Sequence, residues 1–426
     1  MQPKPAPRMP TPPTPAVPRL TYLRIKNYRA LRDVEFRDLT PLTVLIGPNG
    51  SGKSTVLDAL NFLAEAVRGN LVGAWEKRGR FRGMRTRGSE GNIEFEVGMT
   101  TDLLSFPIQY KLMISEIDSK KLAVSEELKR ANELLMSSSP SSNGYVKVEI
   151  PATSELESSR DYQDDKPDWR ATGQLLVESD GGSDESVLPL LTALSTLVKR
   201  ELTLVRNTLS SYRLFNLTDD HLKGYSDAGP REKLSPNGDN LPNVLYYLHE
   251  RHPETLARIT AQLRRWVPGL ADVVPEITSD ERLLLRFKDG PFEKPLPAQY
   301  MSGGTMRLAA LLTLLYEPGA AGLLGIEEPE NELHPQLLPQ LAEELIAASE
   351  DRQLLVATHS PFLLDALEPE QVWILHRGAD GYTQATRAAD IPGVPELVED
   401  GSPLGYLWSS NSLVVGNPLT PLPDAR

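Results

Sequence analysis

The sequence predicts an α/β fold in which a largely parallel sheet is flanked by helices and an α-rich insertion domain splits the chain. Three observations predict it. Short apolar runs alternate with helical patterns toward both ends of the chain, which is typical of buried parallel strands joined by helices. A glycine-rich loop separates one of these runs from a helical pattern. The middle of the chain contains serine-rich, acidic and glycine-rich stretches, which are typical of an insertion with flexible segments.

Changes of composition divide the 426 residues, which have room for two or three domains, into five parts. Eight of the first 18 residues are proline, which predicts a disordered arm. The parts are the Pro-rich arm (1–18), the N-terminal half of the α/β domain (19–113), the insertion domain (114–233), the C-terminal half (234–395) and a C-terminal tail (396–426).

Apolar periodicity predicts the elements of each part. In the N-terminal half we expect a strand, its hairpin partner, a buried strand, a helix and two further strands, at 20–25, 33–36, 42–46, 55–67, 93–98 and 106–113. In the insertion we expect helices over 115–135, which is highly charged, and over 187–206. The C-terminal half alternates helices (241–251, 253–266, 302–316, 336–348) with strands (283–287, 323–326, 354–357, 372–375).

The composition excludes several classes of protein. Cysteine is absent, so the chain can form no disulfide framework, zinc–thiolate site or iron–sulfur cluster. The net charge of −13 argues against a fold that binds nucleic acid over its whole surface. No signal-peptide pattern and no apolar run of about 18 residues occurs. We therefore expect no membrane association and a cytoplasmic location.

The glycine-rich loop has the pattern of a phosphate-binding P-loop. It consists of Gly47, Pro48, Asn49, Gly50, Ser51, Gly52, Lys53, Ser54 and Thr55, and it satisfies G-x-x-x-x-G-K-[ST]. A buried strand before it and an amphipathic helix after it provide the required context. The glycines let backbone N–H groups point at phosphates, and the helix adds its positive N-terminal end. Lys53 is suited to the β- and γ-phosphates and the Ser54 hydroxyl to Mg²⁺.

Three features of the second half agree with this site. Ser302, Gly303 and Gly304 precede a long apolar helix, with Ser302 as a natural N-cap. The apolar strand 323–326 ends in Glu327 and Glu328, which suits metal coordination and water activation. His359 follows another apolar strand. Each feature alone has an ordinary structural explanation, as a capped helix, a charged strand end or a structural histidine.

In this order and spacing, the motifs resemble an ABC-type P-loop ATPase head, and within it the SMC/RecF/OLD branch of DNA-associated ATPases. The segments 25–31 and 326–335 are similar to the N-terminal strand and turn of that branch and to its Walker B motif and D-loop. The resemblance covers about 20–113 and 234–376 and points most closely to stand-alone RecF-like AAA family ATPases.

The resemblance implies an ATPase that uses ATP and Mg²⁺. It assigns the P-loop and Lys53 to the phosphates, Ser54 and Glu327 to Mg²⁺, and Glu328 to the attacking water. His359 would sense the γ-phosphate, and Ser302, Gly303 and Gly304 would reach the γ-phosphate of the opposite subunit. Arg29 is a further candidate for a nucleotide contact. Two heads would close on two nucleotides, so the resemblance implies a homodimer or higher homo-oligomer.

The sequence departs from this pattern at three points. Glu327 stands where aspartate is usual, and Thr305 stands where glutamine or glutamate is common. No glutamine after the first helix can be assigned to a Q-loop, since Gln109 is the first available.

A basic segment suggests what the protein binds besides nucleotide. The eleven residues 77–87 contain six cations and no acid: Lys77, Arg78, Arg80, Arg82, Arg85 and Arg87. Several phosphate contacts from these side chains would give salt-dependent binding to DNA without reading its bases. A solvated loop or a docking surface for an acidic partner would explain the same charges.

Two functional hypotheses therefore stay open. The first is a RecF/OLD-like ATPase that acts on or senses DNA in repair or defence against foreign DNA. Because only a short segment follows 372–375, we expect any nuclease or toxin effector to be a separate protein. The second is an ATP-gated scaffold that holds and releases a protein partner without DNA. The long separation of Lys53 from Ser302 disfavours a transporter subunit.

Overall fold

The computed structural model describes residues 18–417 except for gaps at 102–105, 119–120, 132, 141–145, 150–173, 178–195, 225, 228, 278–281, 291 and 293. Nearly all of the predicted Pro-rich arm and the acidic stretch at 155–168 lie outside the described residues. The first nine residues of the helix expected over 187–206 also lie outside them.

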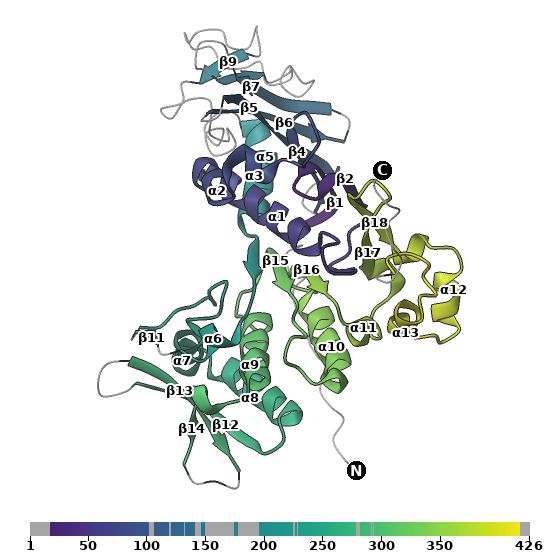
Figure 1. The fold of residues 1–426 in the computed structure, drawn as a ribbon. Coiled ribbons are helices and arrows are strands. Elements are labelled where there is room, and N and C mark those ends of the chain that lie inside the picture. Colours follow the sequence, from purple (N-terminus) through teal and green to yellow (C-terminus); the bar gives the residue numbers. More distant parts are fainter. Residues whose placement is uncertain are drawn as a thin grey trace, which may run out of the picture.

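A six-stranded sheet lies at the centre of the molecule and separates two lobes (Figure 1). Its strands, in order across the sheet, are β10 (Arg213–Phe215), β15 (Leu323–Glu327), β16 (Gln353–Thr358), β3 (Leu42–Ile46), β17 (Val372–Arg377) and β18 (Thr383–Arg387). The first five are parallel and β18 is antiparallel. Strands from both halves of the chain are thus interleaved, which confirms the split α/β architecture.

Burial on both faces explains why these strands are continuous apolar runs. All five residues of β3 are buried. Its Leu45 packs in one hydrophobic core, and Val44 and Ile46 pack in the other. The central sheet is therefore the layer that both lobes share.

The upper lobe in Figure 1 packs a long antiparallel sheet and several helices on one face of the central sheet. The order of the sheet is β2 (Leu31–Arg37), β1 (Arg19–Tyr28), β4 (Ile93–Thr100), β5 (Ile108–Asp118), β6 (Lys121–Arg130), β7 (Glu133–Pro140), β8 (Val146–Glu149) and β9 (Gln174–Val177). The helices are α1 (Lys53–Val67), α2 (Leu71–Lys77), α3 (Arg80–Met84) and α5 (Thr196–Ser210).

The helix expected over 115–135 is wrong, because the described residues of this range, apart from the turn at Ala131, lie in β5, β6 and β7. Alternation in β6 buries Leu122, Val124 and Leu128 against the lobe's core. A neighbouring strand on each side supplies hydrogen bonds along its length. Burial on a sheet therefore outweighs the helical propensity of the many charged residues. The described part of the insertion is rich in strands rather than helices, apart from α5 and the short helix at Asp219–Leu222.

The other lobe packs helices and a small sheet on the second face of the central sheet. Its helices are α6 (Asp219–Leu222), α7 (Leu241–Arg251), α8 (Pro253–Trp266), α9 (Gly303–Leu315) and α10 (Leu338–Ala348). Its strands are β11 (Ser226–Asp227), β13 (Arg282–Asp289), β12 (Leu270–Ile277) and β14 (Leu296–Pro297). Toward the C-terminus follow α11 (Pro361–Leu364), α12 (Val394–Glu399) and α13 (Leu404–Ser409). Short 3₁₀ helices occupy 298–300, 335–337, 369–371 and 388–390.

β10 lies within the range that the sequence assigns to the insertion, yet it pairs in parallel with β15 of the central sheet. The chain therefore returns to the head before residue 233. Among the described helices, none combines the length and apolar character that crossing a bilayer requires.

Candidate active site

The candidate site lies at the carboxyl ends of three neighbouring strands of the central sheet. β3 leads into the loop that contains Lys53, β15 ends at Glu327, and β16 is followed by His359. Because parallel strands end at the same edge of a sheet, the fold brings these three residues together although they are far apart in the chain.

The glycine-rich loop is held in a conformation that needs glycine. Gly50 and Gly52 have φ angles of 73° and 106°, in the left-handed region that other residues rarely adopt. A Cβ atom on Gly52 would lie 2.6 Å from Oγ1 of Thr383 on β18. That hydroxyl donates a hydrogen bond of 2.8 Å to the Ser51 carbonyl. A strand from the far end of the chain therefore supports the loop from behind.

Lys53 is folded onto its own loop. Its Nζ donates to the carbonyl oxygens of Gly47 and Pro48, at 2.8 and 3.2 Å. The residue is only 5% exposed. Burial lowers the lysine pKa to about 8, while the charges of Glu328 and Glu330 act in the opposite direction. The next residue, Ser54, is exposed at the start of α1.

Glu327 at the end of β15 shares its surroundings with Ser54. The Ser54 hydroxyl lies near this carboxylate and favours its charged form, which acts to lower its pKa. Asn216, which follows β10, donates to Oε2 of Glu327 at 3.2 Å. The pKa of Glu327 is nevertheless raised, first by burial and then by the charges of Glu328 and Asp58. This environment disfavours a negative charge that no cation neutralises.

Glu328 has a left-handed backbone conformation, with φ of 44°. Its N–H donates to the Ala357 carbonyl at 2.8 Å. Its Oε2 accepts a hydrogen bond of 2.7 Å from the Asn331 side chain. Its Oε1 lies 3.6 Å from Nε2 of His359. The loop after β15 thus orients this carboxylate toward the residue that follows β16.

Two polar residues that the sequence analysis did not single out support this pair. The Glu330 Oε1 atom accepts a 2.6 Å hydrogen bond from the backbone N–H of His359. Arg307 of α9 is 4% exposed, and its Nη1 donates to the Glu328 carbonyl at 3.0 Å. Its Nη2 donates to the Leu217 carbonyl. The repeated glutamates of 327–332 and the arginine five residues after Ser302 were visible, but no pattern indicated their partners.

Ser302 caps α9 as predicted. Its Oγ accepts a 3.1 Å hydrogen bond from the N–H of Thr305. A Cβ atom on Gly303 would lie 1.7 Å from Oε2 of Glu332, and one on Gly304 would lie 2.5 Å from the Glu332 carbonyl oxygen. These glycines therefore let the loop that follows Glu328 lie directly against the start of α9.

The structure does not bring Ser302, Gly303 and Gly304 to the P-loop of the same chain. Helix α9 packs on the opposite side of the central sheet from α1 (Figure 1). Within the described residues, no hydrogen bond or ion pair joins 302–304 to 47–55.

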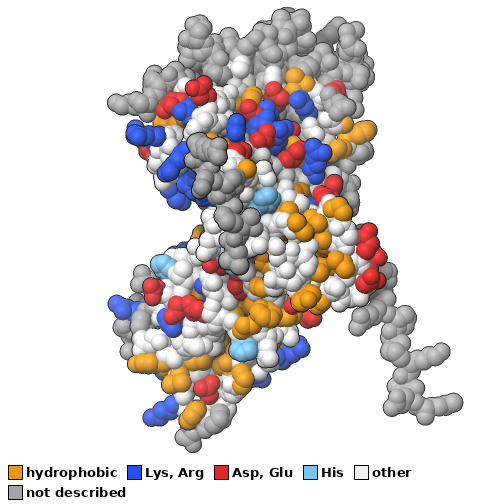
Figure 2. All heavy atoms as spheres, turned by 45° about the vertical axis from the view of Figure 1, so that its right-hand side comes forward, with side chains coloured by type: hydrophobic (Ala, Val, Ile, Leu, Met, Phe, Trp, Pro, Cys, Tyr) orange, Lys and Arg blue, Asp and Glu red, His pale blue; other side chains and the backbone are white. Residues whose placement is uncertain are grey.

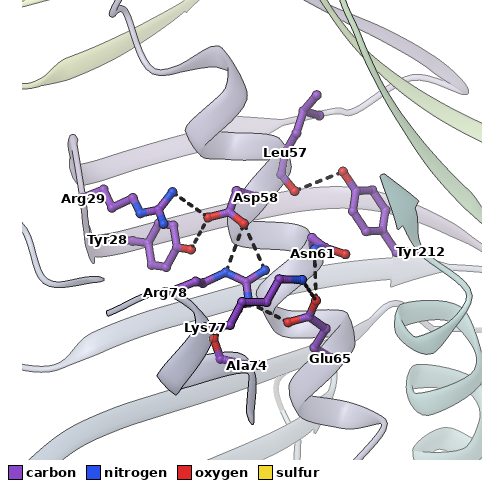
Figure 3. A network of polar contacts seen from close by, with 10 residues as sticks. All are labelled: Tyr28, Arg29, Leu57, Asp58, Asn61, Glu65, Ala74, Lys77, Arg78 and Tyr212. Atoms are coloured by element: carbon purple, nitrogen blue, oxygen red, sulfur yellow. Dashed lines mark hydrogen bonds and ion pairs between the residues drawn. The ribbon is translucent and has the colours of Figure 1, made fainter. Parts of the chain in front are cut away.

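Arg29 lies in a polar network behind the P-loop helix (Figure 3). It sits in the turn after β1, and its Nη1 is 2.8 Å from Oδ2 of Asp58 on α1. The Tyr28 hydroxyl donates to the same oxygen at 2.6 Å. Arg78 contacts the other oxygen of Asp58, and its Nη1 contacts Glu65 at 2.6 Å. The network ties the β1–β2 turn and the basic segment to α1.

The basic segment is not a fully solvated loop. It begins at the last residue of α2 and contains the whole of α3, and the Arg78 side chain is only 3% exposed in its ion pairs with Asp58 and Glu65. The prediction that Arg78 contacts DNA is therefore wrong. Lys77 and Arg80 are exposed but pair with Glu65 and Glu76. Arg82 and Arg87 are exposed, and Arg85 is half-buried over the Phe81 ring.

Figure 2 shows Lys and Arg side chains gathered on the upper lobe, the lobe that contains α1, α2 and α3. The narrowed middle of the molecule and the other lobe present more hydrophobic side chains in this view. The exposed cations of 77–87 that form no ion pair within the described residues are therefore fewer than the sequence suggests, and they lie on the lobe of the P-loop helix.

The residues present fit a nucleoside triphosphate and Mg²⁺. Ser51 Oγ is buried inside the loop and has no hydrogen-bond partner among the described residues. Ser54 and Glu327 provide the hydroxyl and carboxylate oxygens that Mg²⁺ prefers. Among the described residues, no group of three or more acids and histidines could hold a metal alone. This agrees with a cation that takes only one or two protein ligands and is otherwise held by phosphates and water.

Comparisons with known proteins agree with this geometry. Residues 42–365 match the AAA_21 family, which carries the description "AAA domain, putative AbiEii toxin, Type IV TA system". A stretch of 44 residues is 46% identical to an OLD nuclease of Thermus scotoductus. Another, of 58 residues, is 40% identical to the DNA replication and repair protein RecF of Chlorobium luteolum. These stretches are 10% and 14% of this chain and only 8% and 15% of those proteins.

Solved structures of SMC head domains are also similar. One, bound to the C-terminal winged-helix domain of ScpA, aligns with a TM-score of 0.47 and 15% identity over 86% of this chain and 97% of its own. Another, from Pyrococcus furiosus with an extended coiled coil and bound to the C-terminal domain of ScpA, has a TM-score of 0.48 and 12% identity. It covers 90% of this chain and 100% of its own.

Proposed function

Because the chain belongs to the AAA_21 family of AAA domains, we propose that it binds ATP with Mg²⁺, hydrolyses it, and uses the resulting closure of two heads to act on or sense DNA. The family match and the two sequence relatives confirm the resemblance to RecF/OLD/SMC-type ATPases. The chain is thus an ATPase of this general type, and the reaction cycle, its residues and its partners are what we propose.

One observation carries the proposal: the convergence of the P-loop, Glu327, Glu328 and His359 at one edge of the central sheet. Three separate segments of the chain contribute, and each supplies a different chemical group. An ordinary capped helix or charged strand end would not require these groups to meet.

In this site, Lys53 turns from its loop carbonyls toward the phosphates, which favour its charged form. Ser54 and Glu327 hold Mg²⁺, which supplies charge neutralisation along the phosphates when bound. Glu328 orients and polarises the attacking water, and Asn331 keeps its carboxylate in place. His359 is largely neutral at pH 7, since burial and the charge of Lys53 lower its pKa, and it can accept or donate one hydrogen bond near the γ-phosphate.

The position of Ser302 supports head pairing. It caps a helix that does not reach the P-loop of its own chain, and the glycines that follow it are packed against Glu332 of the same chain. A second head would bring Ser302, Gly303 and Gly304 to the γ-phosphate. Each charge-assisted hydrogen bond contributes about 1.5–3 kcal/mol, so several at two sites can drive dimerisation.

The relatives and the basic segment support the DNA part of the proposal. One relative is named a nuclease and the other a DNA replication and repair protein. Arg82 and Arg87 remain exposed for phosphate contacts. The role in repair or defence and the separate nuclease or toxin effector stay predictions made from the sequence.

The structure also keeps the second hypothesis open. Three of the six cations in 77–87 are engaged by acids of the same chain, which weakens the basic patch. An ATP-gated scaffold that binds a protein partner without DNA would need no such patch.

ATP hydrolysis by the purified chain tests both hypotheses, measured with and without duplex DNA at low and high salt. We expect DNA to stimulate hydrolysis and this stimulation to fade at high salt. Arg82→Ala and Arg87→Ala should reduce the stimulation and leave the turnover without DNA unchanged. Arg251→Ala, at an exposed position on α7, is the matched control. A DNA response that is absent at both salt concentrations would favour the scaffold.

Two variants test the site itself. Lys53→Ala should lose ATP binding, whereas Glu328→Gln should bind ATP and lose turnover by at least about 100-fold. Hydrolysis at the parental rate by Glu328→Gln would show that the role of Glu328 is assigned wrongly.

A further inference from the structure

Glu330 is the acid of the candidate site to which the sequence analysis gave no role. It lies in the turn after β15, two residues beyond Glu328. Its Oε1 accepts the 2.6 Å hydrogen bond from the His359 backbone N–H. Its Oε2 is buried and has no hydrogen-bond partner among the described residues.

The charge of Glu330 faces the catalytic groups rather than solvent. It acts on Lys53, His359 and Arg307, and in each case it favours the protonated form of the cationic group. For His359, the other charges that act on the imidazole are Lys53, which disfavours protonation, and Glu328, which favours it. The carboxylate therefore lies among the catalytic side chains.

The loop after β15 orients both members of the Glu328–His359 pair. Asn331 holds the Glu328 carboxylate at 2.7 Å, and Glu330 holds the His359 backbone at 2.6 Å. His359 is the first residue after β16, where backbone N–H groups no longer have a strand partner by default. The imidazole itself lies 3.6 Å from Glu328, while the backbone that carries it is held by Glu330.

We propose that Glu330 is a positioning residue for His359: its carboxylate fixes the backbone after β16, so that the imidazole faces Glu328 and the reacting phosphate. This inference rests on the proposed ATPase function. Glu330 acts through His359 and needs no contact with nucleotide.

The test compares Glu330→Ala, which removes the acceptor, with Glu330→Gln, which keeps an amide oxygen in its place. Steady-state ATP hydrolysis should show kcat reduced by on the order of 10–100-fold in the Ala variant with KM nearly unchanged, and largely restored in the Gln variant. Glu343→Ala, at an exposed position on α10, is the matched control and should equal the parent. Equal losses in the Ala and Gln variants would overturn the proposal.

A double-mutant cycle separates positioning of His359 from a general structural effect. In a His359→Ala background, Glu330→Ala should cause little further loss of kcat, because the residue that it positions is gone. Full additivity of the two losses would contradict the proposal. A parent protein that hydrolyses no ATP would instead refute the proposed function.

The pKa of His359 provides a readout that needs no hydrolysis. It can be measured by NMR titration of the protein with labelled histidine, and the His359 signal is assigned by its loss in His359→Asn. Because the Glu330 charge favours the imidazolium, Glu330→Gln and Glu330→Ala should both lower this pKa, and Glu343→Ala should leave it unchanged. An unchanged pKa in both Glu330 variants would mean that this carboxylate does not face His359.

Discussion

Lys53 shows how burial and charge oppose each other in a single residue. The side chain is almost fully buried, and in the absence of phosphates it is stabilised by two carbonyl oxygens of its own loop. Burial lowers its pKa from 10.5 to about 8. Before nucleotide binds, the positive charge that would pair with phosphates is therefore only moderately favoured at neutral pH. The affinity for nucleotide should therefore depend on pH near this value.

We expect ATP affinity to fall as pH rises from 7 to 9. With a pKa of about 8, Lys53 is roughly nine-tenths protonated at pH 7 and about one-tenth at pH 9. Bound phosphates favour the protonated form, so binding at high pH requires proton uptake and should weaken by about tenfold. Titration with a fluorescent ATP analogue measures this. The control is Lys53→Ala, whose weak residual binding should not change over this pH range. Equal affinities of the parent protein at pH 7 and pH 9 would contradict the expectation.

At the scale of elements, the sequence predicts the strands and helices that carry the site. Continuous apolar runs identify β3, β15 and β16, because both faces of the central sheet are buried. The failure over 115–135 has a physical cause: its charged residues lie on a long antiparallel sheet, and only the alternation of Leu122, Val124 and Leu128 records it.

Long-range polar contacts are what the sequence could not predict at the site. Glu330 lies next to a recognisable motif, but its partner His359 is 29 residues away. Asn216, which contacts Glu327, lies in a segment assigned to the insertion, because nothing in β10 itself shows that it pairs with β15. Local patterns identify elements, whereas these contacts depend on how the elements assemble.

Arg307 connects α9 to the catalytic loop and should transmit the position of Ser302 to Glu328. Arg307→Leu removes the guanidinium donor from the carbonyl oxygens of Leu217 and Glu328, of which the Glu328 oxygen keeps the Asn331 N–H, so we expect a loss of stability of about 1–3 kcal/mol. Because the Glu328 backbone also loses its hydrogen bond from Arg307, kcat should fall by on the order of tenfold, whereas ATP binding should be unchanged. Chemical unfolding and turnover measure the two effects, with Arg251→Leu as control. Parental kcat in Arg307→Leu would show that this contact is not coupled to catalysis.

At the scale of the whole molecule, the two lobes place the two motifs of the proposed reaction on opposite faces of the central sheet. The P-loop helix α1 packs on one face and the Ser302 helix α9 on the other. This arrangement favours completion of each site by a second copy of the chain.

Glu328→Gln should therefore form a dimer when ATP and Mg²⁺ are present and remain monomeric without them. Lys53→Ala should stay monomeric under both conditions, because its residual nucleotide binding is too weak to drive pairing. Light scattering coupled to size-exclusion chromatography distinguishes these states, and Glu343→Gln is the control for a change of charge at an exposed glutamate. An unchanged mass of Glu328→Gln in ATP would exclude nucleotide-driven pairing.

The position of β3 between β16 and β17 has a consequence for synthesis of the protein. β3 and the P-loop are translated early, yet both neighbours of β3 and the supporting Thr383 come from residues beyond 350. On the ribosome, a nascent chain that ends before these residues has a nucleotide loop without its scaffold and a strand with two unpaired edges. If the loop binds nucleotide as proposed, we expect binding to begin only after the residues up to Thr383 have been synthesised.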